Sequence, residues 1–166
     1  MPPETDNLRI EELYLADQKD RQVVYDTPVA VQGLKHRDAM RKSLVLEMLA
    51  QGGVNTANDL YHAAVMLYHG NEPKDFLTAH RLAAGAAISG QRPARWLLAA
   101  ALDRFLMSVG MPQVYGTQFE QDAEANNYQL RLPIDDSALL SWEKKFYGIP
   151  PIAERLKELN SRIQGR

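Results

Sequence analysis

The sequence contains no cysteine among its 166 residues. This absence excludes a disulfide framework, a thiol nucleophile and any metal site built from thiolates. The four histidines form no H-E-x-x-H motif, and His62 and His69 are about two helical turns apart, too far for simple co-ligation of one metal ion. A phosphate-binding glycine loop is also missing, because Gly52-Gly53 is not followed by Lys and Ser or Thr. We therefore expect no metal and no cofactor.

Long apolar runs and a surplus of one charge are lacking as well. The longest purely apolar run is far shorter than the roughly 20 residues that cross a bilayer, and the N-terminal stretch MPPETDNLRIEEL has no signal-peptide core. The chain has 19 basic and 21 acidic residues, which gives a net charge of −2. No basic run stands out. We expect a cytoplasmic protein without nucleic-acid or membrane partners.

The composition is that of an ordinary globular protein, with 45% hydrophobic and 24% charged residues. A chain of this length can bury a core without a disulfide or a metal. We expect a flexible leader over residues 1–7 and a single helical domain over residues 8–166.

Apolar residues recur at helical spacing over most of the chain, and glycine or proline separates the segments. The expected fold is a mainly α, compact helical domain of about six to seven helices with a central αα-hairpin. The Asn126-Asn127 pair and the alternating pattern after it favour a short strand or β-hairpin. Pro28 is expected to close the first helix. The predicted helices cover residues 8–25, 36–51, 59–69, 74–89, 93–109, 137–147 and 151–163.

The central hairpin is dense in alanine, which favours close helix packing rather than chemistry. Its pattern of small and large residues is similar to one unit of the Sel-type, tetratricopeptide-like repeats. Only about one and a half units are visible, between residues 59 and 106, whereas a solenoid needs at least three. We therefore expect a local hairpin and no repeat array.

Four motifs occur in chain order: Ala16-Asp17-Gln18 with Asp20-Arg21, then His69-Gly70, Leu102-Asp103-Arg104, and Gln113 through Gln118. With them the chain resembles a family of uncharacterised bacterial proteins, a domain of unknown function. The resemblance covers about residues 15–151, and the QVYGTQ loop is its most specific part. The family often has glutamine where Tyr68 stands here. The resemblance implies the positions of a site and no reaction.

The QVYGTQ loop follows an apolar helix, and polar side chains so close to a core need partners or a ligand. We expect one cavity between the first helix, the central hairpin and this loop. A histidine oriented by a carboxylate can perform acid–base chemistry, while arginine and amide groups can hold an anion. The predicted catalytic residues are His69, Asp103 and Asp17, and the predicted ligand-binding residues are Gln18, Arg21, Arg104, Gln113, Tyr115, Thr117 and Gln118.

Each of these residues also has a structural interpretation. His69 can cap a helix end, Asp103-Arg104 can form a structural ion pair, and the loop amides can satisfy irregular backbone. Two functions therefore stay open. In the first, a polar pocket binds a small, anionic molecule and performs hydrolysis or lyase chemistry. In the second, the protein is a tetratricopeptide-like interaction module without catalysis, whose protein partner binds Tyr61, Tyr68, Phe76 and Trp96.

Overall fold

The computed structural model describes residues 5–122, 124–137 and 139–164. Within these residues the chain is mainly helical and carries a two-stranded antiparallel sheet, which confirms the expected class. The helices are α1 (Leu8–Asp20), α2 (Pro28–Ala50), α3 (Ala57–Tyr68), α4 (Pro73–Ile88), α5 (Pro93–Ser108), α6 (Glu143–Phe146) and α7 (Ile152–Gln164), and the strands are β1 (Phe119–Asp122) and β2 (Asn127–Leu130).

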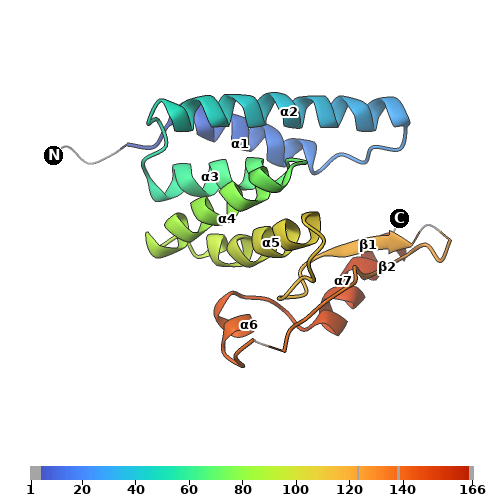
Figure 1. The fold of residues 1–166 in the computed structure, drawn as a ribbon. Helices are drawn as coiled ribbons and strands as arrows, with labels where there is room; N and C mark the ends of the chain where they lie inside the picture. Colours follow the sequence, from blue (N-terminus) through green and yellow to red (C-terminus); the bar gives the residue numbers. More distant parts are fainter. Residues whose placement is uncertain (1–4, 123, 138, 165–166) are drawn as a thin grey trace.

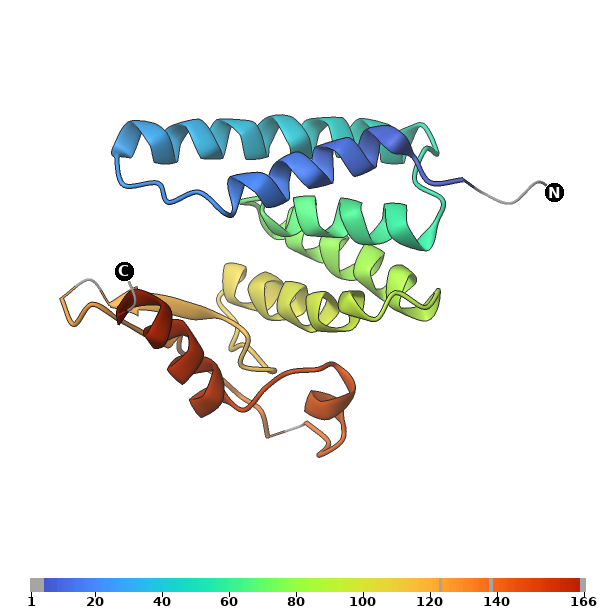
Figure 2. The same cartoon turned by 180° about the vertical axis from the view of Figure 1, so that it is seen from behind.

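The elements stack in chain order (Figure 1). Helices α1 and α2 lie side by side at one end, α3, α4 and α5 form the middle, and the hairpin with α7 lies at the other end (Figures 1 and 2). Helix α2 has 23 residues and α3 only 12, so the N-terminal half of α2 projects past the C-terminal end of α3. None of the helices in the described residues is both long and apolar enough to cross a membrane.

The start of α2 corrects the prediction. The sequence places a break at Pro28 and a helix start at His36, but α2 begins at Pro28 itself. Thr27 caps the helix by accepting a hydrogen bond at 3.2 Å from a backbone N–H of the first turn. Proline suits the first helical position because an N–H there has no intrahelical acceptor. Helix α1 also ends earlier than predicted, at Asp20 rather than Tyr25.

Alanine packing holds the middle layer together. Met66 and Leu67 of α3 contribute the large side chains of the core, and Ile10 and Val45 join α1 and α2 to it. Without large side chains between them the helices approach closely, as the alanine density predicts. The fully buried alanines are Ala63, Ala64, Ala79, Ala83, Ala86, Ala94, Ala99, Ala100 and Ala101.

Side-chain caps fix the helix starts. Thr56 and Asp59 form a reciprocal capping box at α3, in which each side chain accepts a hydrogen bond from the other residue's backbone N–H. Asn7 caps α1, and its own backbone N–H donates to Asp59 at 2.8 Å. Asn7 is therefore held in place, although the sequence assigns residues 1–7 to a flexible leader. Residues 1–4 of that leader lie outside the described part of the chain.

The hairpin near Asn126 forms as expected. Strands β1 and β2 pair antiparallel with Phe119 opposite Leu130, and Asn126 takes φ 47°, a conformation that asparagine tolerates. Helix α7 is tied to β2 by one side chain. The side-chain Oδ1 of Asn160 accepts a hydrogen bond from the Tyr128 backbone N–H at 2.6 Å. The side-chain Nδ2 of Asn160 donates one to the Tyr128 backbone carbonyl at 3.3 Å.

The helix predicted over residues 137–147 is wrong in extent. Among the described residues of this range, only the four of α6 are helical. The Asp135 carboxylate accepts hydrogen bonds from the Ser137 backbone N–H at 3.2 Å and from its hydroxyl at 2.5 Å. These bonds stabilise a turn instead of a helix N-cap. Ala138, inside the predicted helix, lies outside the described residues.

Candidate functional site

Four aspartates are almost completely buried in the described residues, and three of them bind backbone amides. Asp59 and Asp75 accept hydrogen bonds at the starts of α3 and α4. Asp103 accepts them from the loop that follows α5. Asp17 differs, because its hydrogen-bond partners are all side chains. A carboxylate that orients other side chains is the stronger candidate for a functional role.

Asp103 organises the QVYGTQ loop. Its Oδ1 accepts hydrogen bonds from the backbone N–H groups of Val114 at 2.7 Å and Tyr115 at 2.9 Å. Its Oδ2 accepts from the Thr117 backbone N–H at 3.0 Å and from the Thr117 hydroxyl at 2.7 Å. These four bonds saturate the carboxylate. The predicted ion pair with Arg104 is therefore wrong, because loop amides occupy the carboxylate instead.

The loop glutamines bind within the fold. Gln113 is fully buried, donates to the carbonyls of Gln118 and Arg131, and accepts from the Gln118 backbone N–H at 2.9 Å. The Gln118 amide donates to the Ala100 carbonyl at 3.1 Å and to the Tyr68 hydroxyl at 3.2 Å. These amides satisfy the irregular backbone, as their structural interpretation predicts.

Tyr115 and Gly116 complete the packing of this loop. The Tyr115 ring is buried and meets the Tyr147 ring edge-on, with 5.3 Å between centroids. Burial, reinforced by Tyr147, raises the pKa of the Tyr115 hydroxyl. Gly116 has φ 75°, and a Cβ there would lie 3.1 Å from the Ile152 side chain. The loop is therefore a packed part of the core.

The contact between Asp17 and His69 joins α1 to the end of α3. His69 Nδ1 lies 3.0 Å from Asp17 Oδ1, and Arg21 and Gln18 each donate to the same carboxylate at 3.0 Å. Burial opposes ionisation of Asp17, but His69 and Arg21 outweigh it and hold the pKa of Asp17 below its usual value. An ionised carboxylate only accepts hydrogen bonds, so Nδ1 carries the proton. In the neutral ring, Nε2 on the opposite side is then the proton acceptor.

An ion network next to Asp17 joins α1 to α2. Asp38 lies 2.6 Å from both Arg21 and Arg41. Asp20 lies 2.8 Å from Arg41 and 2.9 Å from Arg37. The hydrogen bond from Arg37, reinforced by Arg41, lowers the pKa of Asp20 to about 2. The buried Nε of Arg41 makes no hydrogen bond to the described residues. Arg37 and Arg41 of α2 thus have acidic partners.

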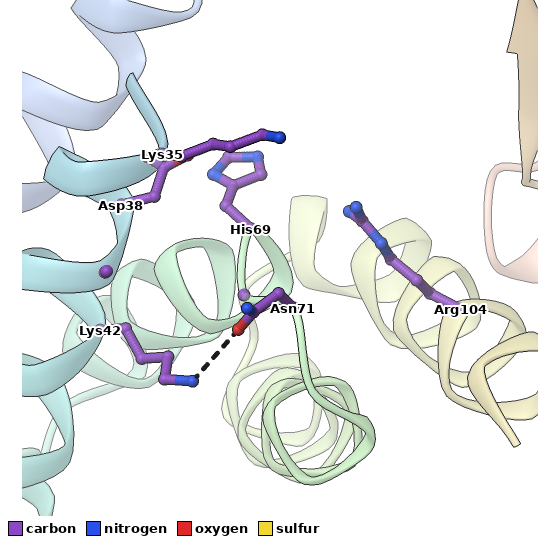
Figure 3. A pocket seen from close by; sticks show the side chains of 8 residues that line it. Lys35, Asp38, Lys42, His69, Asn71 and Arg104 are labelled. Carbon is purple, nitrogen blue, oxygen red and sulfur yellow. Dashed lines mark hydrogen bonds between the residues drawn. The ribbon is translucent and has the colours of Figure 1, made fainter. Parts of the chain in front are cut away.

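A cavity of about 350 Å³ lies beneath the projecting half of α2 (Figure 3). The side chains of Lys35, His69 and Arg104 extend into the same space from α2, from the α3–α4 turn and from α5. The His69 side chain is 20% exposed, so the cavity reaches the imidazole while Asp17 behind it stays buried. The cavity is lined by Lys35, Asp38, Ala39, Lys42, His69, Gly70, Asn71 and Arg104.

Arg104 is fixed by aromatic and backbone contacts. Its Nη1 donates to the Tyr68 carbonyl at 2.9 Å. Its guanidinium carbon lies 4.8 Å from the ring centroid of Tyr68 and 5.0 Å from that of Phe76. These contacts hold a positive charge at the cavity wall, and Arg104 has no acidic partner among the residues that the structure describes. Tyr68 links the cavity to the loop, because its hydroxyl accepts from Gln118.

The α3–α4 turn that carries His69 is rigid. Lys42 Nζ lies 2.7 Å from the Asp75 carboxylate and 3.3 Å from Glu72. The same Asp75 oxygen accepts hydrogen bonds from two backbone N–H groups of the turn. Gly70 has no room for a side chain, because a Cβ there would lie 2.5 Å from this oxygen. The position of His69 is therefore set by α2 and α4 together.

The predicted site residues do not share one cavity; they divide into two groups. Only His69 and Arg104 line the cavity. The expectation of a single site fails because the loop carboxylate and amides satisfy one another inside the fold. The first group, at or behind the cavity, is Asp17, Gln18, Arg21, His69 and Arg104, and the second, in the loop, is Asp103, Gln113, Tyr115, Thr117 and Gln118.

The sequence reasoning missed the cavity residues that α2 contributes. Lys35, Asp38 and Lys42 are spaced by three and four residues and so share one helix face. The signal was Thr27 followed by Pro28, a helix cap followed by a favourable first residue. Reading that pair as a helix start would have extended α2 over Lys35 and revealed this face.

Compared with family models, curated proteins and solved structures, the chain matches none. The resemblance to an uncharacterised bacterial family therefore stays a prediction. A function can therefore be inferred only from the geometry of the cavity.

Proposed function

We propose that the cavity binds a small anionic molecule and that His69, oriented by Asp17, exchanges a proton with it. The 3.0 Å contact between Asp17 and His69 Nδ1 is the observation that carries this proposal. A neutral imidazole held in this way can take a proton at Nε2, and the Asp17 charge stabilises the imidazolium that forms. Hydrolysis or elimination in a small metabolite is the reaction class that suits such a group.

The charges of the cavity wall support an anionic ligand. Lys35 and Arg104 line the cavity and form no ion pair with the described residues. Lys42 also lines it but is paired with Asp75 at 2.7 Å. Asp38 is already neutralised by two arginines at 2.6 Å. The wall therefore carries a surplus of positive charge, which favours carboxylate or phosphate groups.

A protein-interaction module is our second candidate. Phe76 is only 5% exposed, and Tyr61, Tyr68 and Trp96 pack against the core clusters. Aromatic side chains in these positions contribute to folding and offer little area to a partner. We therefore favour the small-molecule function.

A thermal-shift screen tests the proposal. The wild type, His69→Gln and a control, His36→Gln, are melted with a panel of small carboxylates and phosphates. His36 is exposed on α2 and does not line the cavity. A ligand at about 100 times its Kd adds roughly 2.7 kcal/mol, which is about 5 to 10 °C for a chain of this size.

We expect at least one compound to stabilise the wild type and the His36→Gln variant by several degrees. NMR should show that the wild type converts this compound and that the His69→Gln variant does not. The proposal of a binding site fails if no compound stabilises the wild type. The proposal of proton transfer fails if the bound compound is converted equally well without His69.

A further inference from the structure

Most cations around the cavity are already paired with carboxylates. Lys42 is held by Asp75 at 2.7 Å and by Glu72 at 3.3 Å. Arg21 and Arg41 each lie 2.6 Å from Asp38. The paired cations are neutralised within the fold, so they need no acidic group from a ligand.

Two cations are not neutralised. Lys35 is exposed and forms no ion pair or hydrogen bond with the described residues. Within the same residues Arg104 donates only through Nη1, to the uncharged Tyr68 carbonyl, and its plane rests against two aromatic rings. The remaining guanidinium N–H groups of Arg104 are thus available to a ligand.

These two cations stand on different walls of the cavity, and the His69 imidazole lies beside Lys35 (Figure 3). Lys35 extends from α2 over His69, and Arg104 reaches toward His69 from α5 (Figure 3). A ligand with a single acidic group can pair with one of them and leaves the other without a counter-charge. A ligand with an acidic group at each end pairs with both and lies in the cavity that His69 also lines.

We propose that the ligand is a small dianion with two separate acidic groups, carboxylate or phosphate, one bound by Lys35 and the other by Arg104. This inference rests on the proposed function and specifies its substrate class. Arg104 binds its group through two parallel hydrogen bonds, whereas Lys35 acts as a point charge. Proton transfer by His69 then takes place on the atoms between the two acidic groups.

Matched pairs of ligands test this inference. Titration calorimetry at low ionic strength compares succinate with succinamate and glutarate with glutaramate, so that each pair differs by one charge at nearly constant size. Phosphoglycolate serves as the phosphate-bearing probe. The proteins are the wild type, Lys35→Gln, Arg104→Gln and the control Lys157→Gln, which changes an exposed lysine on α7. Thermal melts verify that each variant is folded, and the neutral Arg104→Met replaces Arg104→Gln if the latter is not.

We expect at least one diacid to bind the wild type and Lys157→Gln about tenfold more tightly than its monoamide, a difference of about 1.4 kcal/mol. In Lys35→Gln or the Arg104 variant, the Kd of the diacid should rise toward that of the monoamide. Tighter binding of phosphoglycolate than of the dicarboxylates would identify one group as a phosphate. Equal affinities of diacid and monoamide in the wild type would overturn the dianion inference and leave the anion site standing. Failure of every anion to bind would overturn both.

Discussion

Asp17 and Asp103 are buried to the same degree but have different partners. Asp103 of α5 accepts hydrogen bonds from three backbone N–H groups and one hydroxyl of the loop after that helix, which leaves no position for a substrate. Asp17 accepts from the side chain of His69, whose ring reaches the cavity. At the residue scale, the type of partner rather than burial separates the structural carboxylate of Asp103 from the carboxylate that we propose to be functional.

The variant Asp103→Asn tests the structural role of Asp103. One carboxylate oxygen is replaced by an NH2 group, which then faces the backbone N–H groups that the oxygen had bound. The remaining hydrogen bonds lose the help of the negative charge. The free energy of unfolding should therefore fall by about 2 to 4 kcal/mol. Urea denaturation measures this loss. The control Asp26→Asn changes an exposed carboxylate and should stay within about 0.5 kcal/mol of the wild type. Unchanged stability together with lost anion binding would instead support a role in the site.

At the element scale, the turn between α3 and α4 sets the geometry of the site. Asp75 binds the backbone of this turn and also the ammonium group of Lys42, so α2, α3 and α4 meet at one carboxylate. This arrangement needs a residue without a side chain at position 70. The sequence predicts Gly70 as a helix stop. The structure shows that glycine is also required because the Asp75 side chain lies so close to the backbone at this position.

The substitution Gly70→Ala should therefore displace the turn. Its Cβ would lie 2.5 Å from Asp75 Oδ2 and 2.7 Å from Asp75 Cβ, so we expect a loss of about 2 kcal/mol in unfolding free energy and weaker anion binding. Gly85→Ala is the matched control. It lies inside α4, where the nearest atom to a new Cβ is 3.4 Å away. Alanine there should leave stability unchanged or raise it by up to about 1 kcal/mol. Equal effects of the two substitutions would contradict this explanation.

At the scale of the whole molecule, α1 and α2 form a layer that an ion network holds together and that packs on the middle helices through apolar side chains. Ile10 and Val45 provide the buried apolar contact. Asp17, Asp20 and Asp38 hold arginines of both helices. Because ion pairs join α1 to α2, the free energy of unfolding should depend on pH.

We expect the free energy of unfolding to fall as the pH drops from about 4 to about 2. Asp20 has its pKa lowered from 3.8 to about 2 in the folded protein. The unfolded chain therefore takes up this proton first, so the stabilisation is fully present above pH 4 and is lost as the pH approaches 2. Urea denaturation at pH 2, 3, 4 and 5 measures the slope. Asp20→Asn should flatten it relative to the wild type and to Asp26→Asn; an unchanged slope in Asp20→Asn would show that Asp20 contributes nothing to it.

Features that depend on neighbours in the chain were predictable. Helical periodicity, glycine stops such as Gly90 and Gly110, and the Asn126-Asn127 turn act over a few residues, and each appears in the structure. The errors were at positions where one local signal competes with another. Pro28 was interpreted as a helix stop but starts α2, and Asp135 forms a turn with Ser137 rather than the start of a long helix.

The sequence by itself determined the mainly helical class, the alanine-rich packing of the middle helices and the short hairpin, because these follow from local preference and side-chain size. Only the tertiary structure decided which polar residues meet. Asp17 and His69 are 52 positions apart, and their contact depends on how α1 packs against α3. Lys35 and Arg104 likewise share a cavity only because α2 projects beyond α3. Local pattern cannot encode such contacts, since they result from the packing of whole helices.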